Sequence, residues 1–367
     1  MLKKLNFKNL DRKMLIYIGI GLGMIFLLII VLAILKATVN HRINSKQFEN
    51  KLKEASIKYY KDNSDKLPKK NDLNVTISID ELVSSGYIKD PNKLLKKGLT
   101  CSGNVVVSNN NGFYIYQPII ECNDDYKTKL LYQKVLEDNP IKQSGNGLYQ
   151  VNDYYLFRGE ELNNYVSFAD KKWYILRINN DNTLKLVLID NFNHDTVWDD
   201  RYNSSVDNYY GKNDFSISRI KEELDYYFND IFDEKTKPLI VPKEFCNGSR
   251  SINATSIDGS IECSKHTEKI PLGLLQVNEL VLASIDPECK GIYDLQCTNY
   301  NYLVNLSSSW TMNAVAENTY EVYSLYNTIP RKYYAKEKSQ PRLVLNISAN
   351  ALYNGGSGTN EDPYIIK

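Results

Sequence analysis

The longest apolar stretch lies near the N-terminus and predicts a membrane-spanning helix. Residues 14–35 carry no charge, and Lys36 ends the stretch. These 22 residues would span about 33 Å as a helix, enough for a hydrocarbon core of about 30 Å. A cleaved signal peptide is the alternative, because basic residues precede the stretch, but its apolar core would be shorter. We therefore expect a cytoplasmic tail over 1–13 and an uncleaved anchor over 14–35.

An amphipathic pattern follows the apolar stretch. Phe48, Leu52, Ala55 and Tyr59 recur at the spacing of one helix face. No glycine or proline lies between Gly23 and Pro68, so nothing in this stretch breaks a helix. We predict a stalk helix over 36–66 that continues the anchor, so that one helix runs from residue 14 to about residue 61.

Two folded modules are expected after the stalk, separated by a linker over 131–147. In the first, over 67–130, residues 78–87 have the capping serine and terminal glycine of a short helix. In the second, over 148–367, alternation and helical spacing predict a hairpin at 173–189, helices at 217–231 and 278–283, and strands at 321–326 and 342–345. Intermixed strands and helices indicate an α+β domain.

The cysteines indicate the compartment. All six follow the apolar stretch and are expected to pair locally as Cys101 with Cys122, Cys246 with Cys263, and Cys289 with Cys297. Such disulfides persist only outside the reducing cytosol. Basic residues flank the apolar stretch on both sides and do not set its orientation. We expect a protein of the cell membrane with its N-terminus in the cytoplasm and its bulk outside the cell.

The charge balance excludes one class of partner. The chain has 45 Lys and Arg residues against 44 Asp and Glu, a net charge of +1. Nucleic-acid binding needs a basic surface, so no nucleic-acid partner is expected, and no motif calls for a cofactor.

The N-terminal half resembles a type IV pilin or pseudopilin. The resemblance covers residues 14 to about 127 and is carried by the long helix, by Ile79-Asp80-Glu81-Leu82, by Gly86-Tyr87-Ile88 and by the cysteine-flanked hairpin. It implies a small pilin-like α+β module over 67–130. Pilins have a peptidase motif before the apolar helix, where this chain has Asp11-Arg12-Lys13-Met14. That departure argues against assembly into a pilus.

The C-terminal half, about residues 148 to 367, resembles an uncharacterised domain of surface proteins from low-GC Gram-positive bacteria. The matching residues include Phe157-Arg158-Gly159-Glu160, Trp173 with its hairpin, Ser309-Trp310-Thr311-Met312 and Arg342-Leu343-Val344-Leu345. The pattern is distantly similar to the C-type-lectin-like fold. It implies a larger α+β, C-type-lectin-like domain, and no catalytic residue is carried over.

Few side chains combine into a candidate site. His41, His194 and His266 are scattered and no C-x-x-C occurs, so no metal site is expected. Asp199 and Asp200 offer oxygen ligands to calcium, although such runs more often form turns.

Two further features concern binding. Trp310 is a candidate ligand-pocket aromatic, with a core position as the alternative. Gly19 and Gly23 form a G-x-x-x-G pair through which two anchors could associate into a homo-oligomer.

The leading hypothesis is a non-catalytic binding or adhesion protein of the bacterial surface that takes an unknown protein or glycan ligand. It is favoured because no set of catalytic residues can be assembled from the sequence. Two alternatives stay open: a pseudopilin-like component of an envelope export or filament machine, and an enzyme that modifies envelope polymers.

Overall fold

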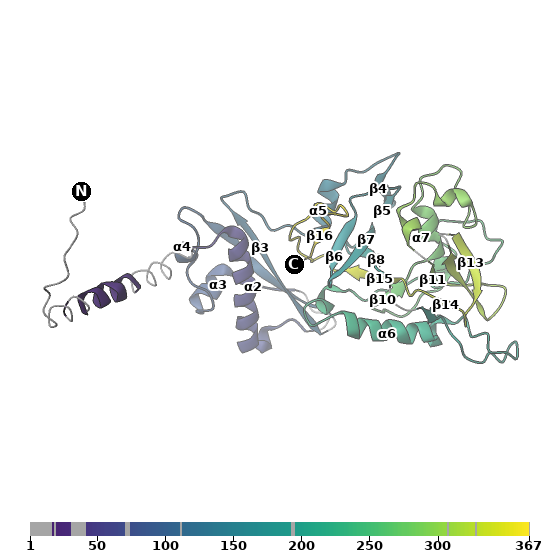
Figure 1. Cartoon of the computed structure of the whole chain (residues 1–367), viewed down its shortest axis with the longest axis horizontal. Helices are drawn as coiled ribbons and strands as arrows, with labels where there is room; N and C mark the ends of the chain where they lie inside the picture. The colour runs from purple at the N-terminus through teal and green to yellow at the C-terminus, as the bar shows by residue number, and fades with distance from the viewer. Residues whose placement is uncertain are drawn as a thin grey trace, which may run out of the picture. The chain divides into compact units, whose positions relative to one another are not determined.

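The computed structural model describes residues 17, 20–30, 42–69, 74–110, 112–191, 195–306, 308–326 and 329–366 (Figure 1). Contacts divide the chain into two compact units. The first comprises residues 1–64, 77–105 and 118–127, and the second comprises 65–76, 106–117 and 128–367. The units therefore interleave along the sequence.

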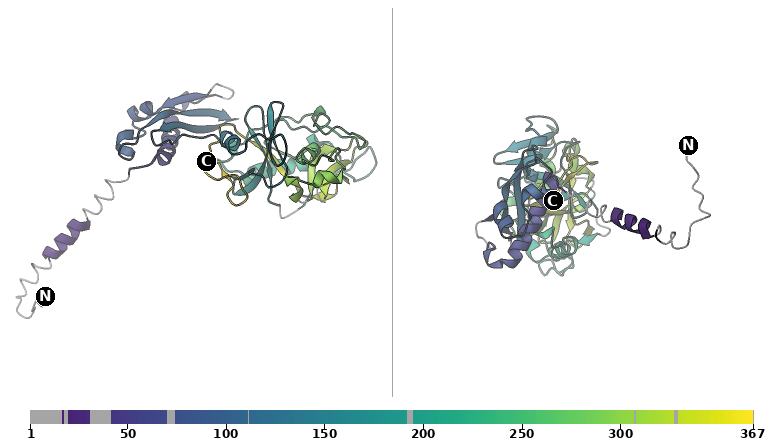
Figure 2. Two further views of the ribbon diagram at one scale, coloured as in Figure 1. Left: turned by 90° about the horizontal axis from the view of Figure 1, so that it is seen from above. Right: turned by 90° about the vertical axis from the view of Figure 1, so that its left-hand side faces the viewer.

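The first unit packs a helix against a small sheet. Its helices are α2 (Ser45–Asp62), α3 (Ile79–Ser84) and α4 (Pro91–Leu94). The strands β1 (Val75–Ser78), β2 (Cys101–Asn110) and β3 (Phe113–Cys122) form a sheet of order β1-β2-β3, of which residues 77–78, 101–105 and 118–122 belong to the first unit and the rest to the second. The predicted apolar stripe of α2 is confirmed, since Phe48, Leu52, Ala55 and Tyr59 are buried. Figures 1 and 2 show α2 lying across one face of this sheet.

The expectation of one long anchor-and-stalk helix is wrong. Helix α2 begins after Asn44, whose backbone is extended with φ −84° and ψ 174°. The Asn44 side chain accepts a hydrogen bond from the amide of Gln47, and the Gln47 side chain accepts one from the amide of Asn44. This reciprocal capping box ends the helix on its N-terminal side. Ile43 instead pairs with Leu95 in a parallel bridge.

The predicted membrane span over 14–35 is also not supported. Among the described residues, no helix combines the length and the apolar character needed to cross a membrane. The described part of this segment includes a helical stretch over residues 20–30. Gly23 lies in that stretch, whereas Gly19 is outside the described residues.

The second unit is built on a large mixed sheet. Its main order is β10-β15-β8-β7-β5-β4, and β6 pairs with β7 and in parallel with β16. The strands are β4 (Gly147–Val151), β5 (Tyr154–Arg158), β6 (Tyr165–Phe168), β7 (Lys171–Ile178), β8 (Leu184–Leu188), β10 (Leu272–Leu274), β15 (Leu343–Ile347) and β16 (Tyr364–Ile365). The β7–β8 pair confirms the predicted hairpin.

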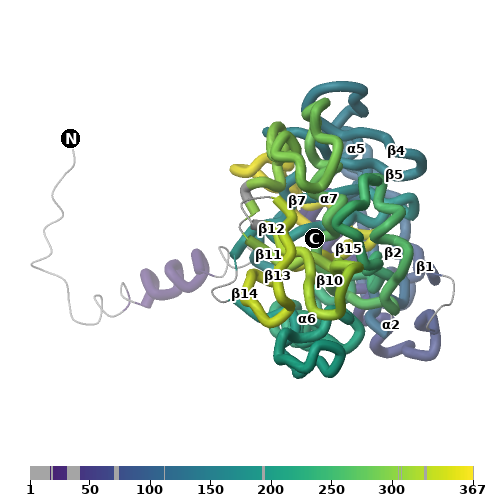
Figure 3. Tube along the Cα trace, turned by 90° about the vertical axis from the view of Figure 1, so that its right-hand side faces the viewer, coloured from purple at the N-terminus to yellow at the C-terminus, as the bar shows by residue number. Residues whose placement is uncertain are grey.

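Smaller elements surround this sheet. A second sheet joins β11 (Ser309–Ala314), β12 (Glu321–Tyr326) and β13 (Ile329–Tyr334), and β9 (Thr196–Val197) pairs with β14 (Lys338–Ser339). The helices are α5 (Leu131–Asp138), which occupies part of the expected linker, α6 (Arg219–Ile231) and α7 (Val277–Leu282). Figures 1 and 3 show α6 running beside β10. The amphipathic helix expected over 217–231 is thereby confirmed.

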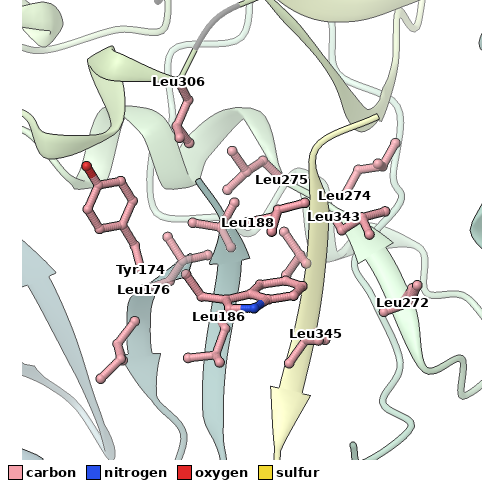
Figure 4. Close-up of a cluster of buried hydrophobic side chains, with 14 of the residues drawn as sticks. Tyr174, Leu176, Leu186, Leu188, Leu272, Leu274, Leu275, Leu306, Leu343 and Leu345 are labelled. Atoms are coloured by element: carbon pink, nitrogen blue, oxygen red, sulfur yellow. The ribbon is translucent and has the colours of Figure 1, made fainter. Parts of the chain in front are cut away.

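A large apolar core fills most of the second unit, and a smaller cluster of buried residues lies around Val277 and Tyr323. Leucine side chains from β8, β10 and β15 point toward one another within the large core (Figure 4). Trp173, Trp198 and Trp310 are all fully buried. The second unit is thus an α+β domain in which strands predominate, in agreement with the fold class expected for this part of the chain.

Candidate functional site

The structure places the cysteines as expected. Disulfides join Cys101 to Cys122 across the β2–β3 hairpin, Cys246 to Cys263, and Cys289 to Cys297. All three predicted pairings are therefore confirmed.

Trp310 does not line a pocket. Its side chain is fully buried, and its indole N–H donates to the carbonyl oxygen of Thr196 at 2.8 Å. Its ring meets Tyr333 edge-on. The candidate ligand-pocket aromatic is therefore a core residue, the alternative that its position in a strand already allowed.

The Asp199 carboxylate is occupied by protein donors. It is fully buried and accepts hydrogen bonds from the backbone amides of Arg201 and Lys212 at 3.0 and 3.1 Å. The Arg201 guanidinium pairs with its other oxygen. Asp200 is exposed and pairs with Arg219. Asp199 thus fixes the loop that follows β9, and the two carboxylates do not converge as calcium ligands would.

The most unusual polar feature is a row of three side chains across the middle of the large sheet. Arg177 on β7 pairs in register with Lys185 on β8, and Lys185 pairs with Asn346 on β15. Directly paired residues point to the same face of a sheet. Two cations side by side on neighbouring strands repel each other, so this row needs compensation from another element.

Helix α7 supplies the compensating charge. The ammonium of Lys185 forms an ion pair with the carboxylate of Glu279, and both side chains are at most 6 % exposed. The other Glu279 oxygen accepts from the amide of Gln276 at 3.0 Å. The Lys185 ammonium also lies 5.7 Å from the ring centroid of Phe245, a favourable cation–π arrangement. Lys185 therefore has a carboxylate partner, whereas Arg177 forms no ion pair with the described residues.

Burial and charge act in opposite directions on this pair. Burial lowers the pKa of Lys185 to about 8, although Glu279 opposes the shift. Burial also disfavours the charged form of Glu279, but Lys185 and Arg177 outweigh it and hold the pKa of Glu279 below its ordinary value. Both groups are therefore ionised at neutral pH.

A small polar pocket opens above this row. Its volume is about 190 Å³. It is lined by side chains from β7, β8, β15 and the loops beside them: Arg177, Asn179, Asn180, Lys185, Lys243, Glu244, Phe245, Cys246, Gln276 and Asn346. Drug-sized ligands need about 300 to 1,000 Å³. The pocket therefore suits one sugar ring or a similarly small polar group.

The pocket walls are held in place by amide hydrogen bonds. Asn179 accepts from Nε of Arg177 at 2.8 Å and donates to the side-chain oxygen of Asn346 at 3.0 Å. The terminal Nη atoms of Arg177 donate to no atom of the described residues. The guanidinium lies 5.4 Å from the ring centroid of Tyr154. Arg177 is thus oriented by its neighbours and keeps donors for a ligand.

A second, larger cavity lies in the first unit and is a weaker candidate. It measures about 1,290 Å³ and is lined by residues of α2, α3 and α4, with Arg42, Lys51, Lys89 and Lys93 at its rim. These four side chains are exposed. Exposed lysines are mobile and screened by salt. The smaller pocket offers Lys185, which is buried, and Arg177, which is half-buried and held by Asn179, so we assign the candidate site there.

The sequence contained only a faint signal of this site. In Leu184-Lys185-Leu186, alternation predicts that the lysine points to solvent, yet Lys185 is 2 % exposed. The row becomes visible only when Lys185 is seen beside its partners. Arg177 is close to it in sequence, but Asn346 and Glu279 are distant.

No protein-family model, curated protein or solved structure matches the chain. The resemblances to pilins and to surface-protein domains therefore stay predictions.

Proposed function

We propose that this protein is an exported, disulfide-stabilised binding protein whose second unit holds an acidic sugar residue of a glycan in the polar pocket. The carrying observation is the row of half-buried Arg177 and buried Lys185 and Asn346, which places charge in the middle of a sheet whose other strands are largely apolar. Burying charges costs free energy. Such local departures from an apolar core concentrate at functional sites.

The donor set favours a carboxylate. A guanidinium presents a planar fork that matches the two oxygens of a carboxylate, and Arg177 keeps its Nη donors for such a group. Lys185 and Lys243 also line the pocket. Lys185 pairs with Glu279 and Lys243 pairs with Asp181, and neither carboxylate is part of the lining. Glu244 also lines the pocket. Among the described residues, Arg177 is the lining cation that forms no ion pair, so a negative ligand group is expected to bind at its Nη atoms.

The remaining lining favours sugar hydroxyls. The side-chain amides of Asn179, Asn180, Gln276 and Asn346 both donate and accept hydrogen bonds. Phe245 contributes an apolar ring to the same wall. A ring that carries hydroxyls on its edge and one carboxylate, as in a uronic acid, satisfies all of these groups together.

Export is supported by the disulfides. Three bridges and the lack of any free cysteine among the described residues fit an oxidising compartment. We place the second unit outside the cytoplasm, where acidic glycans of the envelope or of a host surface are accessible.

The proposal is tested by titrating the oxidised protein with D-glucuronate and D-galacturonate, with D-glucose as the neutral probe. We expect at least one uronate to bind and glucose to bind about tenfold or more weakly, since a charge-assisted hydrogen bond contributes about 1.5 to 3 kcal/mol. Arg177→Gln should remove the preference for the uronate. Arg331→Gln, which changes an exposed arginine on β13, is the matched control and should bind as the unaltered protein does. Equal affinity for glucose, or no binding of either uronate, contradicts the proposal.

A further inference from the structure

A histidine lies beside one of the disulfides. The sulfur atoms of Cys246 and Cys263 and a ring nitrogen of His266 all lie within 4.8 Å of one another. Cys263 and His266 are exposed and Cys246 is half-buried, so solutes reach the group. Cys, Cys and His are three of the ligands that zinc sites use.

The backbone holds these three residues together independently of the sulfur–sulfur bond. Cys246 and His266 face each other in an antiparallel bridge. The amide of Thr267 donates a hydrogen bond to the carbonyl oxygen of Phe245 at 2.9 Å. The amide of Gly248 donates one to the carbonyl oxygen of Glu262 at 2.7 Å.

Hydrogen bonds and an ion pair also fix the segment that carries Cys263. The amide of Cys263 donates to Gly259 at 2.9 Å, and the neighbouring Glu262 forms a fully buried ion pair with Arg250 at 2.7 Å. The side chains would therefore stay close after the disulfide opens.

We propose that reduction of the Cys246–Cys263 disulfide converts this loop into a binding site for a thiophilic divalent cation such as Zn²⁺, with both thiolates and the His266 imidazole as ligands. In a tetrahedral site, zinc bonds of about 2.3 Å to sulfur and 2.0 Å to nitrogen place the ligand atoms about 3.5 Å apart. The two sulfur atoms are bonded to each other in this structure, so they would have to move apart by rotation of the cysteine side chains once the bond is reduced. The fourth position is open to water.

An external thiol or phosphine reductant supplies the two electrons that open the disulfide. The sulfur–sulfur bond accepts two electrons and two protons and breaks into two thiols, while the reductant is oxidised. Binding of the cation then displaces the two thiol protons, and neutral imidazole donates its lone pair. In an oxidising compartment the disulfide stays closed and the site does not exist, so metal binding would report reducing conditions.

The experiment uses the full chain, reduced anaerobically with a phosphine, and titrates it with Co²⁺. Thiolate-to-cobalt charge-transfer absorption and tetrahedral d–d bands should appear with one equivalent of bound metal and should vanish when Zn²⁺ is added. The oxidised protein should give no signal. His266→Ala should shift the d–d bands and weaken Co²⁺ binding, and Cys246→Ser with Cys263→Ser should abolish it.

A second disulfide provides the matched control. Cys289–Cys297 is not part of any group of three metal-ligating side chains among the described residues. A Cys289→Ser, Cys297→Ser variant should therefore bind Co²⁺ as the unaltered reduced chain does. The proposal is overturned if this variant loses the signal, if His266→Ala leaves the bands unchanged, or if the reduced chain binds no Co²⁺. Unfolding on reduction that the metal does not reverse also overturns it, because the backbone is required to hold the ligands. The uronate titration uses the oxidised protein, so the two proposals fail separately.

Discussion

The ammonium of Lys185 contacts the carboxylate of Glu279 beneath the polar pocket, and neither side chain is more than 6 % exposed. The two residues come from different layers, β8 of the large sheet and the short helix α7. Arg177 and Asn346 flank Lys185 on the neighbouring strands. The ion pair therefore holds Lys185 in place on the floor of the pocket and also holds α7 against the large sheet.

Breaking the pair from one side should destabilise the second unit strongly. Glu279→Gln leaves Lys185 buried beside Arg177 without its carboxylate, and Lys185→Met leaves Glu279 without its nearest cation. Loss of one partner of a buried pair typically costs about 3 to 5 kcal/mol. The double variant should cost less than the sum of the two, because no buried charge is left unpaired between them. Urea unfolding of the four proteins measures this, and strictly additive costs would show that the pair is not coupled.

Alkaline pH should stabilise the folded protein through Lys185. The folded state releases this proton at a pKa of about 8, whereas the ordinary value is 10.5. Between these values the unfolded chain binds more protons, so the free energy of unfolding rises with pH. The double variant Lys185→Met, Glu279→Gln lacks this titration. Between about pH 8 and 10, the free energy of unfolding of the unaltered protein should therefore rise relative to that of the double variant.

The same comparison has the same sign in acid, because the pKa of Glu279 is also lowered in the folded state and stability again rises with pH. The pKa of Glu279 is lowered in the folded state, so its contribution is present above the ordinary glutamate value and is lost as the pH falls through the folded value. A flat difference across the alkaline window would show that Lys185 is not desolvated in solution.

Tyr302 provides a prediction of increased stability. Its side chain is buried, its ring meets Tyr174 edge-on, and its hydroxyl has no hydrogen-bond partner among the described residues. Burial and the nearby Glu279 raise the pKa of Tyr302, so the phenol stays neutral. An unsatisfied buried hydroxyl costs about 1 to 3 kcal/mol. Tyr302→Phe keeps the ring and should raise the free energy of unfolding by about 1 kcal/mol in urea. A clear loss of stability would instead reveal a partner for this hydroxyl in solution.

Local patterns predicted much of this architecture. Cysteine spacing gave the three disulfides, alternation gave the β7–β8 hairpin, and helical spacing gave α6 and the buried stripe of α2. Each of these depends on residues within about 20 positions of one another. The polar pocket does not, because Lys185 is separated from Asn346 and Glu279 by most of the domain, and a single strand read alone places Lys185 toward solvent.

The predicted long helix failed for a different reason. The absence of glycine and proline between Gly23 and Pro68 removes only one of the signals that stop a helix. A helix is also stopped by an N-cap, and Asn44 with Gln47 three residues later is a capping box. Asparagine is common in this chain, so only the extended backbone at position 44 distinguishes this cap from an ordinary polar residue.

Replacing that cap should destabilise the start of α2. Asn44→Ala removes the side-chain oxygen that accepts from the amide of Gln47 at 2.9 Å, and loss of such a cap typically costs about 1 kcal/mol. Amide hydrogen exchange should become faster in the first turn of α2, from Ser45 onward, while the end of the helix near Tyr59 changes little. Lys58→Ala changes an exposed position inside the same helix and should leave exchange in the first turn unaltered. Slower exchange at residues 42–44 in Asn44→Ala would contradict this prediction. It would mean that α2 extends toward the N-terminus when the cap is removed, so that the cap sets where the helix starts and does not stabilise its first turn.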